Sequence, residues 1–111
     1  MGLSTHILDT ALGRPAANVG FVLSQMQDGA WHEIGRGETD SDGRCKSLLG
    51  DTPFQAATYK LRFATAEYYA AQKLTGLYPF VVIVFVVADP KQHFHIPLLL
   101  TANGYTTYRG S

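Results

Sequence analysis

The chain carries no excess charge and almost no cysteine. Nine basic and nine acidic residues balance to a formal net charge of zero, so no basic stripe exists to neutralise a run of nucleic-acid phosphates. We therefore expect no nucleic-acid partner. The single cysteine, Cys45, cannot form an intramolecular disulfide, which favours a reducing compartment.

Segments that would direct the chain to a membrane or out of the cell are also missing. The longest apolar run, residues 78–88, is rich in β-branched residues and falls short of the roughly 20 residues that a membrane-spanning helix needs. The first ten residues lack the basic start and apolar core of a secretory signal. The last residues do not form a peroxisomal tripeptide. We expect a cytoplasmic protein with no membrane partner.

Several catalytic signatures are absent as well. The sequence has no phosphate-binding loop, no Gly-x-Ser-x-Gly elbow and no Cys-x-x-Cys pair. Paired carboxylates of the kind that glycosidases use are not apparent. Phosphoryl transfer and serine-nucleophile chemistry therefore find no support in the sequence.

The length and composition predict one domain over residues 1–111, with a real hydrophobic core. Hydrophobic residues make up 46% of the chain and charged residues only 16%. With so few charges available for the surface, we expect part of it to be covered by partner subunits.

Alternating apolar and polar residues recur at short intervals between Gly, Pro and Asp clusters, which is typical of a β-sandwich or barrel. In residues 57–65, for example, Tyr59, Leu61 and Phe63 are predicted to face one side of a strand. The expected strands are 3–9, 18–27, 31–39, a strand that begins at Arg44 after the Asp-Gly turn, 57–65, 79–89, 93–101 and 104–110.

One segment departs from this rhythm. Residues 65–76 carry Ala, Glu, Gln and Lys, with Thr65 at the start and Gly76 at the end. This pattern predicts a short capped helix, the only one expected in the chain.

Two histidines of the segment "HFHIP" are candidates for chemistry. On a strand, His93 and His95 would point to the same face, about 6.6 Å apart, with Phe94 on the other face. Such a pair can bind zinc or transfer protons near neutral pH, and a packed or surface pair is at least as common. His6 lies on the first predicted strand, on the face that Ser4 also occupies.

Two arginines are further candidates. Arg44 follows the turn "DSDG" and begins a strand, where its guanidinium could be held in a fixed position. Arg109 lies near the end of the printed sequence, between Tyr108 and Gly110. Taken singly, the first could be an ordinary surface cation and the second part of a solvated terminus.

Taken together, these residues resemble those of the transthyretin-like family, and within it the 5-hydroxyisourate hydrolase branch. The resemblance covers essentially the whole chain. The histidine-bearing first motif and the terminal tetrapeptide are its most specific parts, and the hormone carrier transthyretin is understood to lack them. The segments that carry the resemblance are "LSTHILDTALGRPAANV", "TDSDGR", "TYKLRF", "DPKQHFHIPLLL" and "YRGS".

The resemblance implies an all-β fold: a transthyretin-like, eight-stranded β-sandwich with one short α-helix. It also implies a homotetramer, built as a dimer of dimers, with active sites between the dimers. The substrate implied is a small molecule, 5-hydroxyisourate, whose six-membered ring is opened by hydrolysis. We expect neither a cofactor nor a metal.

The resemblance also implies the site residues. Catalysis would fall on His6, Arg44, His95 and Ser111. Substrate binding would fall on His6 and Arg44 together with Tyr108, Arg109 and Gly110. His93 would support the site without contacting the substrate.

Two other interpretations stay open from the sequence. A transthyretin-like tetramer could carry a small aromatic ligand without catalysis, although an apolar carrier channel has no use for His6, Arg44 and His95 together. A zinc protein could use His6, His93 and His95, although no cysteine or acidic fourth ligand is evident nearby.

Overall fold

The computed structural model describes residues 2–46 and 48–110. Among them, nine strands and one helix follow one another along the chain. These are β1 (Leu3–Asp9), β2 (Arg14–Pro15), β3 (Gly20–Gln27), β4 (Ala30–Glu38), β5 (Arg44–Cys45), β6 (Ala57–Phe63), α1 (Thr65–Ala71), β7 (Val81–Val87), β8 (Phe94–Thr101) and β9 (Gly104–Thr107). No helix in the described ranges is both long and apolar enough to cross a membrane.

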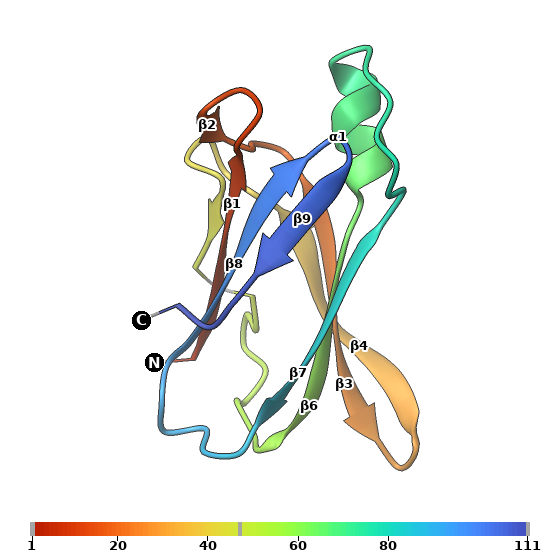
Figure 1. Ribbon diagram of the computed structural model, residues 1–111. Helices are drawn as coiled ribbons and strands as arrows, with labels where there is room; N and C mark the ends of the chain where they lie inside the picture. The colour runs from red at the N-terminus through yellow and green to blue at the C-terminus, as the bar shows by residue number, and fades with distance from the viewer. Residues whose placement is uncertain (1, 47, 111) are drawn as a thin grey trace.

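The strands form two sheets that face each other, with α1 at one end (Figure 1). One sheet has the order β2-β1-β8-β9, and β5 also pairs with β1. The other sheet has the order β4-β3-β6-β7. β1 and β8 run parallel, whereas the other pairs are antiparallel. This arrangement confirms the predicted all-β sandwich with one short helix.

The core lies between the two sheets, and the period of the sequence explains it. Tyr59, Leu61 and Phe63 on β6 are completely buried, while Lys60 and Arg62 point away from the core. The same alternation buries Leu3, Thr5, Ile7 and Asp9 on β1. The predicted faces of these strands are therefore confirmed.

The strand predicted to begin at Arg44 is much shorter than its neighbours. It contains only Arg44 and Cys45 and pairs with the middle of β1. The two-residue strand β2, which the sequence did not predict, pairs with the far end of β1. Both are too short to produce a periodic pattern. Because β2 is additional to the eight expected strands, the two sheets together contain nine strands among the described residues.

The helix ends earlier than predicted, at Ala71 and not near Gly76. Lys73 adopts a left-handed conformation, with φ of 59°. The N–H of Leu74 reaches back to the carbonyl of Tyr69 at 2.9 Å, which closes the helix as a Schellman motif does. Gly76 has a different role: a Cβ there would lie 2.6 Å from Cδ2 of Tyr69.

The start of the helix also differs from the prediction. Thr65 is the first helical residue and is not the cap, and Ala64 precedes it without a side-chain cap. The Thr65 hydroxyl instead donates a hydrogen bond of 2.6 Å to the carbonyl of Tyr78. Thr65 therefore ties the helix to the segment that leads into β7.

A buried hydrogen bond joins the helix to β1. The Tyr68 hydroxyl donates to Oδ2 of Asp9 at 2.7 Å, and the other carboxylate oxygen accepts from the backbone N–H groups of Ala11 and Leu12. Burial and then the hydrogen bond to Asp9 raise the pKa of Tyr68. The neighbouring Tyr69 is also buried, but its hydroxyl has no hydrogen-bond partner within the described residues.

Substitution of Tyr68 by phenylalanine is therefore expected to lower the free energy of unfolding by about 1–3 kcal/mol, because it leaves a buried carboxylate oxygen without its donor. Tyr69→Phe is the matched control, and it should leave stability unchanged or raise it, since its hydroxyl is already unpartnered. Urea unfolding of both variants measures the difference. Equal losses in the two variants would contradict the assigned role of the Tyr68 to Asp9 bond.

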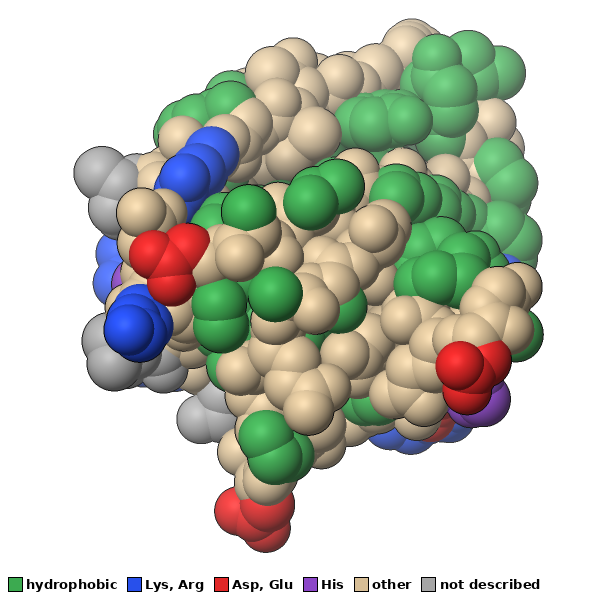
Figure 2. All heavy atoms as spheres, turned by 90° about the horizontal axis from the view of Figure 1, so that it is seen from below, with side chains coloured by type: hydrophobic (Ala, Val, Ile, Leu, Met, Phe, Trp, Pro, Cys, Tyr) green, Lys and Arg blue, Asp and Glu red, His purple; other side chains and the backbone are tan. Residues whose placement is uncertain are grey.

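Apolar side chains also reach the outside of the molecule. Figure 2 views the end opposite α1 and shows hydrophobic side chains gathered over one side of it, with charged side chains sparse. On β7, an edge strand, Val82, Val84 and Val86 are 45%, 55% and 68% exposed. Tyr105 and Tyr108, on and after the other edge strand β9, are exposed as well.

Candidate functional site

Strand pairing brings three distant segments to one face of the five-stranded sheet. β1 lies between β8 and β5, with Ser4 opposite His95 and His6 opposite Arg44. Side chains of residues that face each other across paired strands project from the same side of the sheet. Ser4, His6, Arg44 and His95 therefore converge, although they lie up to 91 residues apart in sequence.

These residues line a hollow of about 270 Å³. The structure thus places the predicted residues His6, Arg44 and His95 around a single space, with His93 beside them. The full lining is Ser4, Thr5, His6, Arg44, Lys46, His93 and His95.

His95 on β8 and His93, which directly precedes that strand, meet at one oxygen atom. Ser4 Oγ lies 3.0 Å from Nε2 of His93 and 2.8 Å from Nδ1 of His95. Phe94 between them is buried on the opposite side, as the alternation predicted. The sequence reasoning did not assign Ser4 to the site, although its place two residues before His6 on the same strand face was a usable signal.

The surroundings of His95 favour its neutral form. Partial burial lowers the pKa of His95, and the nearby His6, His93 and Arg44 lower it further because a positive charge there would be repelled. At neutral pH the imidazole of His95 is therefore available as a proton acceptor.

A tight turn places Arg44 beside His6. Oδ1 of Asp40 accepts hydrogen bonds of 2.9 Å from the backbone N–H groups of Asp42 and Arg44, and the bond from Arg44 is the main cause of the lowered pKa of Asp40. Gly43 has φ of +72°, and a Cβ there would collide with the Ile7 carbonyl. The turn requires glycine, as the Asp-Gly pair predicted.

The last residues of the described chain lie against His95. The N–H of Gly110 donates to the His95 carbonyl at 2.8 Å, and a Cβ on Gly110 would lie 2.6 Å from Cδ2 of the His95 ring. Figure 1 shows the segment that follows β9 passing next to β8 and β1. A close approach between this backbone and the imidazole therefore depends on glycine at position 110.

The other predicted residues of the terminal segment lie differently. The Arg109 guanidinium stacks on the Phe94 ring at 4.0 Å and donates to Oε1 of Gln92 at 2.9 Å. Neither Tyr108 nor Arg109 belongs to the lining of the hollow in this single chain. Ser111 lies outside the described residues.

Metal ligation was the alternative left open by the histidines. Across residues 2–46 and 48–110, no group of three or more His, Cys, Asp or Glu residues is arranged to hold a metal ion. The three-histidine zinc arrangement is thus not seen in the part of the chain that the structure describes.

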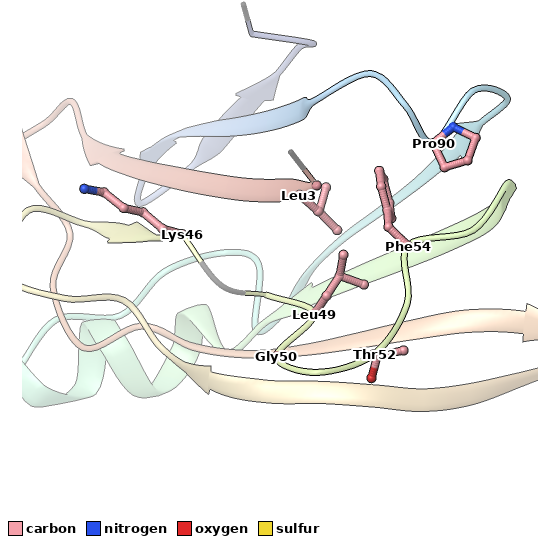
Figure 3. A pocket seen from close by; sticks show the side chains of 8 residues that line it. Leu3, Lys46, Leu49, Gly50, Thr52, Phe54 and Pro90 are labelled. Carbon is pink, nitrogen blue, oxygen red and sulfur yellow. The ribbon is translucent and has the colours of Figure 1, made fainter.

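A second hollow, of about 350 Å³, adjoins the first and shares Lys46 with it. Figure 3 shows Leu3, Leu49 and Phe54 converging at its apolar end, while Lys46 extends away from them. Its lining includes no histidine. Of these two hollows, the smaller one therefore holds the histidines, with Lys46 at the boundary between the two.

Comparisons with known proteins agree over almost the whole chain. A model described as the HIUase/Transthyretin family matches residues 3–110. A 5-hydroxyisourate hydrolase of Mus musculus is 42% identical over 111 residues, covering 98% of this chain and 94% of the mouse protein. The structure of a Klebsiella pneumoniae 5-hydroxyisourate hydrolase matches with a TM-score of 0.82 and 32% identity, covering 100% of both chains. Sea bream transthyretin in complex with thyroxine matches with a TM-score of 0.92 and 32% identity, covering 99% of this chain and 95% of that one.

Proposed function

The chain belongs to the HIUase/transthyretin family, and from this premise we propose how its own residues carry out the reaction. Relatives named 5-hydroxyisourate hydrolase, from bacteria and animals, match it over nearly its full length. The protein is accordingly a hydrolase that opens the ring of 5-hydroxyisourate to 2-oxo-4-hydroxy-4-carboxy-5-ureidoimidazoline in urate degradation. These relatives favour catalysis over the carrier alternative.

The convergence of His6, Arg44 and His95 on one hollow carries the proposed mechanism. Hydrolysis of the ring amide needs a base for the attacking water, a stabiliser for the oxyanion that forms on the carbonyl, and a proton for the departing nitrogen. His95 and His6 act together on the water and on the departing nitrogen. The neutral state of His95 suits it to accept the proton of the water.

Arg44 performs the electrostatic task. Its guanidinium stays protonated at every relevant pH, so it cannot act as a base. It presents several N–H donors in a planar arrangement that suits a flat, carbonyl-rich substrate. We assign to it the binding of the substrate and the stabilisation of negative charge on the attacked carbonyl.

The terminal segment shapes the site. Gly110 lies against the His95 ring and holds it in place, and Tyr108 and Ser111 are proposed to contact the substrate or order the water. Because the Arg109 side chain stacks on Phe94, we propose that Arg109 anchors this segment, in place of the substrate contact that the resemblance implied.

The proposed assembly is a homotetramer built as a dimer of dimers, in which each chain is one domain over residues 1–111. Exposed apolar side chains on and near the two edge strands, including Val84 and Val86 on β7 and Tyr105 on β9, support subunit contacts there. We also propose a cytoplasmic location, for which the single cysteine is the support.

Decay of the substrate tests the proposal. 5-Hydroxyisourate is generated in place from urate and urate oxidase, and its ultraviolet absorbance is followed with and without the protein. The full chain should accelerate the decay, and a chain lacking residues 109–111 should not, while light scattering still reports the tetramer. A protein that gives no acceleration but binds aromatic ligands would instead support the carrier interpretation.

Two glycine variants separate the role of the terminal segment from its mere presence. Gly110→Ala should lower kcat by about 10²-fold, because displacement of a catalytic group by an ångström has that effect, and the new Cβ would meet His95. Gly104→Ala on β9 is the matched control, since its nearest neighbour would lie at an ordinary 3.7 Å. Equal activity in the two variants would show that contact between Gly110 and His95 is irrelevant to catalysis.

A further inference from the structure

We propose that Ser4 is a positioning residue that links His93 and His95 into a proton relay, so that charge formed on His95 during hydrolysis passes to His93. The proposal rests on the function assigned above and adds two residues to its mechanism. It is carried by one oxygen atom that lies within hydrogen-bond distance of both imidazoles.

The hydrogen-bonding capacity of a hydroxyl makes this contact directional. Ser4 has one proton to donate and lone pairs to accept with. It can therefore donate to only one of the two ring nitrogens, and the other ring must donate to it. The arrangement that suits a base is the one in which His95 donates from Nδ1 to Ser4 and Ser4 donates to Nε2 of His93, because Nε2 of neutral His95 is then free to accept a proton from the water. The tautomers of the two rings are thus set by a single hydroxyl.

The relay follows from what happens when His95 accepts a proton. His95 is then a donor at both nitrogens, so the proton on Nδ1 is directed at Ser4 Oγ. Transfer of that proton to Ser4, with transfer of the Ser4 proton to Nε2 of His93, moves one positive charge from His95 to His93. Ser4 ends as a neutral hydroxyl, and no atom or electron is gained or lost.

The environment of the two rings gives the transfer its direction. His95 is partly buried, whereas His93 is exposed, so a positive charge is better hydrated on His93 and its proton can leave to water. The charged and titratable groups near the pair are His6 from β1, Arg44 from β5, Lys46 after it, and Arg109 beside Phe94. None of these residues carries a carboxylate, so none of them would stabilise a positive charge on His95.

The backbone keeps Ser4 in position to do this. Ser4 lies opposite His95 in the parallel pair of β1 and β8, and the N–H of Phe94 donates to the Gly2 carbonyl at 2.8 Å. Only 9% of Ser4 is exposed, which limits competition from water. The register of β1 and β8 therefore holds the Ser4 hydroxyl between the two rings.

Three variants test the relay. Ser4→Ala should lower kcat by about 10- to 100-fold, a loss like that seen when a group that orients a metal-ligating histidine is removed, with KM little changed. Ser4→Thr retains the hydroxyl and should restore most of the activity. Ser24→Ala is the matched control, because Ser24 is similarly buried but lies in the other sheet.

The pH profile and the tautomers of the two histidines would not change on substitution of Ser4 if its role were purely structural. Nitrogen-15 NMR of histidine-labelled protein should show His93 and His95 titrating as a coupled pair, and this coupling should vanish in Ser4→Ala. His93→Gln can still bond to Ser4 but cannot accept the charge, so it should reproduce the loss. Combining it with Ser4→Ala should cost nothing further, because both interrupt one chain.

The outcomes are distinct. Wild-type kcat and pH profile in Ser4→Ala, or additive losses in the double variant, would overturn the relay. If Ser4→Ala does not fold, uncoupled titration of His93 and His95 in the wild type, or full activity in His93→Gln, would overturn it equally. Full activity in His95→Ala would instead refute the proposed mechanism itself, so the two failures cannot be confused.

Discussion

Replacing His95 by alanine is expected to lower kcat by roughly 10²- to 10⁴-fold, the range of a single general acid-base contribution. The loss should fall on kcat more than on KM, because we assign His95 to the water and not to substrate binding. Folding should persist, since the ring lines a hollow and its backbone pairing with Ser4 and Gly110 does not depend on the side chain. Stopped-flow or conventional ultraviolet kinetics on 5-hydroxyisourate measures the change.

The pH dependence of the wild-type enzyme gives the same assignment a second test. The pKa of His95 is lowered by its partial burial and by the surrounding cations, so the neutral base persists to a lower pH than a free imidazole would allow. As pH falls, kcat should therefore hold below the ordinary pKa of histidine, about 6.5, and decline only near the lowered value. An acid limb at or above that ordinary value would contradict the role of His95 as the neutral base.

The control for this substitution is a histidine with no part in the site. His32 is exposed on β4, in the other sheet. His32→Ala should leave kcat, KM and the pH profile unchanged. Comparable losses in His32→Ala and His95→Ala would show that histidine removal acts through the fold, and the assignment of His95 would fall.

The local pattern of the sequence predicted the buried faces of the strands and the position of the helix. The alternation in residues 57–63 fixed which side chains of β6 are buried, because a strand presents successive residues to opposite faces. The pattern placed the helix but not its end. The helix was expected to end at Gly76, whereas the left-handed residue that follows its last turn is Lys73. Glycine usually marks the left-handed position at the end of a helix, so a lysine there could not be recognised from the sequence.

The site depends on pairing that no local pattern contains. His6 and His95 meet because β1 runs parallel to β8, a register that joins segments about 90 residues apart. The sequence pattern marked His6, His95 and Arg44 as candidates, but only the family resemblance placed them in one site, and the resemblance did not include Ser4. In the single chain, the orientation of Arg109 depends on an aromatic ring that lies fifteen positions earlier, a contact that no local pattern predicts.

Replacing Arg44 by alanine is expected to lower kcat/KM by about 10²- to 10³-fold, the range found when one donor to a developing oxyanion is removed. The side chain is exposed, and its turn is held by backbone bonds to Asp40 that the substitution retains. The thermal midpoint should therefore stay close to that of the wild type. Kinetics on 5-hydroxyisourate, together with a melting curve, separates the loss of activity from a loss of fold.

Arg44→Lys distinguishes charge from geometry. Lysine keeps the positive charge but not the planar set of donors, so we expect it to restore only part of the activity. Arg14→Ala, an exposed arginine on β2 of the same sheet, is the matched control and should behave as the wild type. If Arg44→Lys were fully active, a point charge would suffice and the proposed planar contact with the substrate would be wrong.

The same substitution also reports on His95. Arg44 is one of the cations that lower the pKa of His95, so its removal should raise that pKa towards the ordinary value. The acid limb of the residual activity in Arg44→Ala should then move to higher pH, and Arg14→Ala should show no shift. If the acid limb of the pH profile did not shift, the charge of Arg44 would not act on His95, and the two residues could not be assigned to one site.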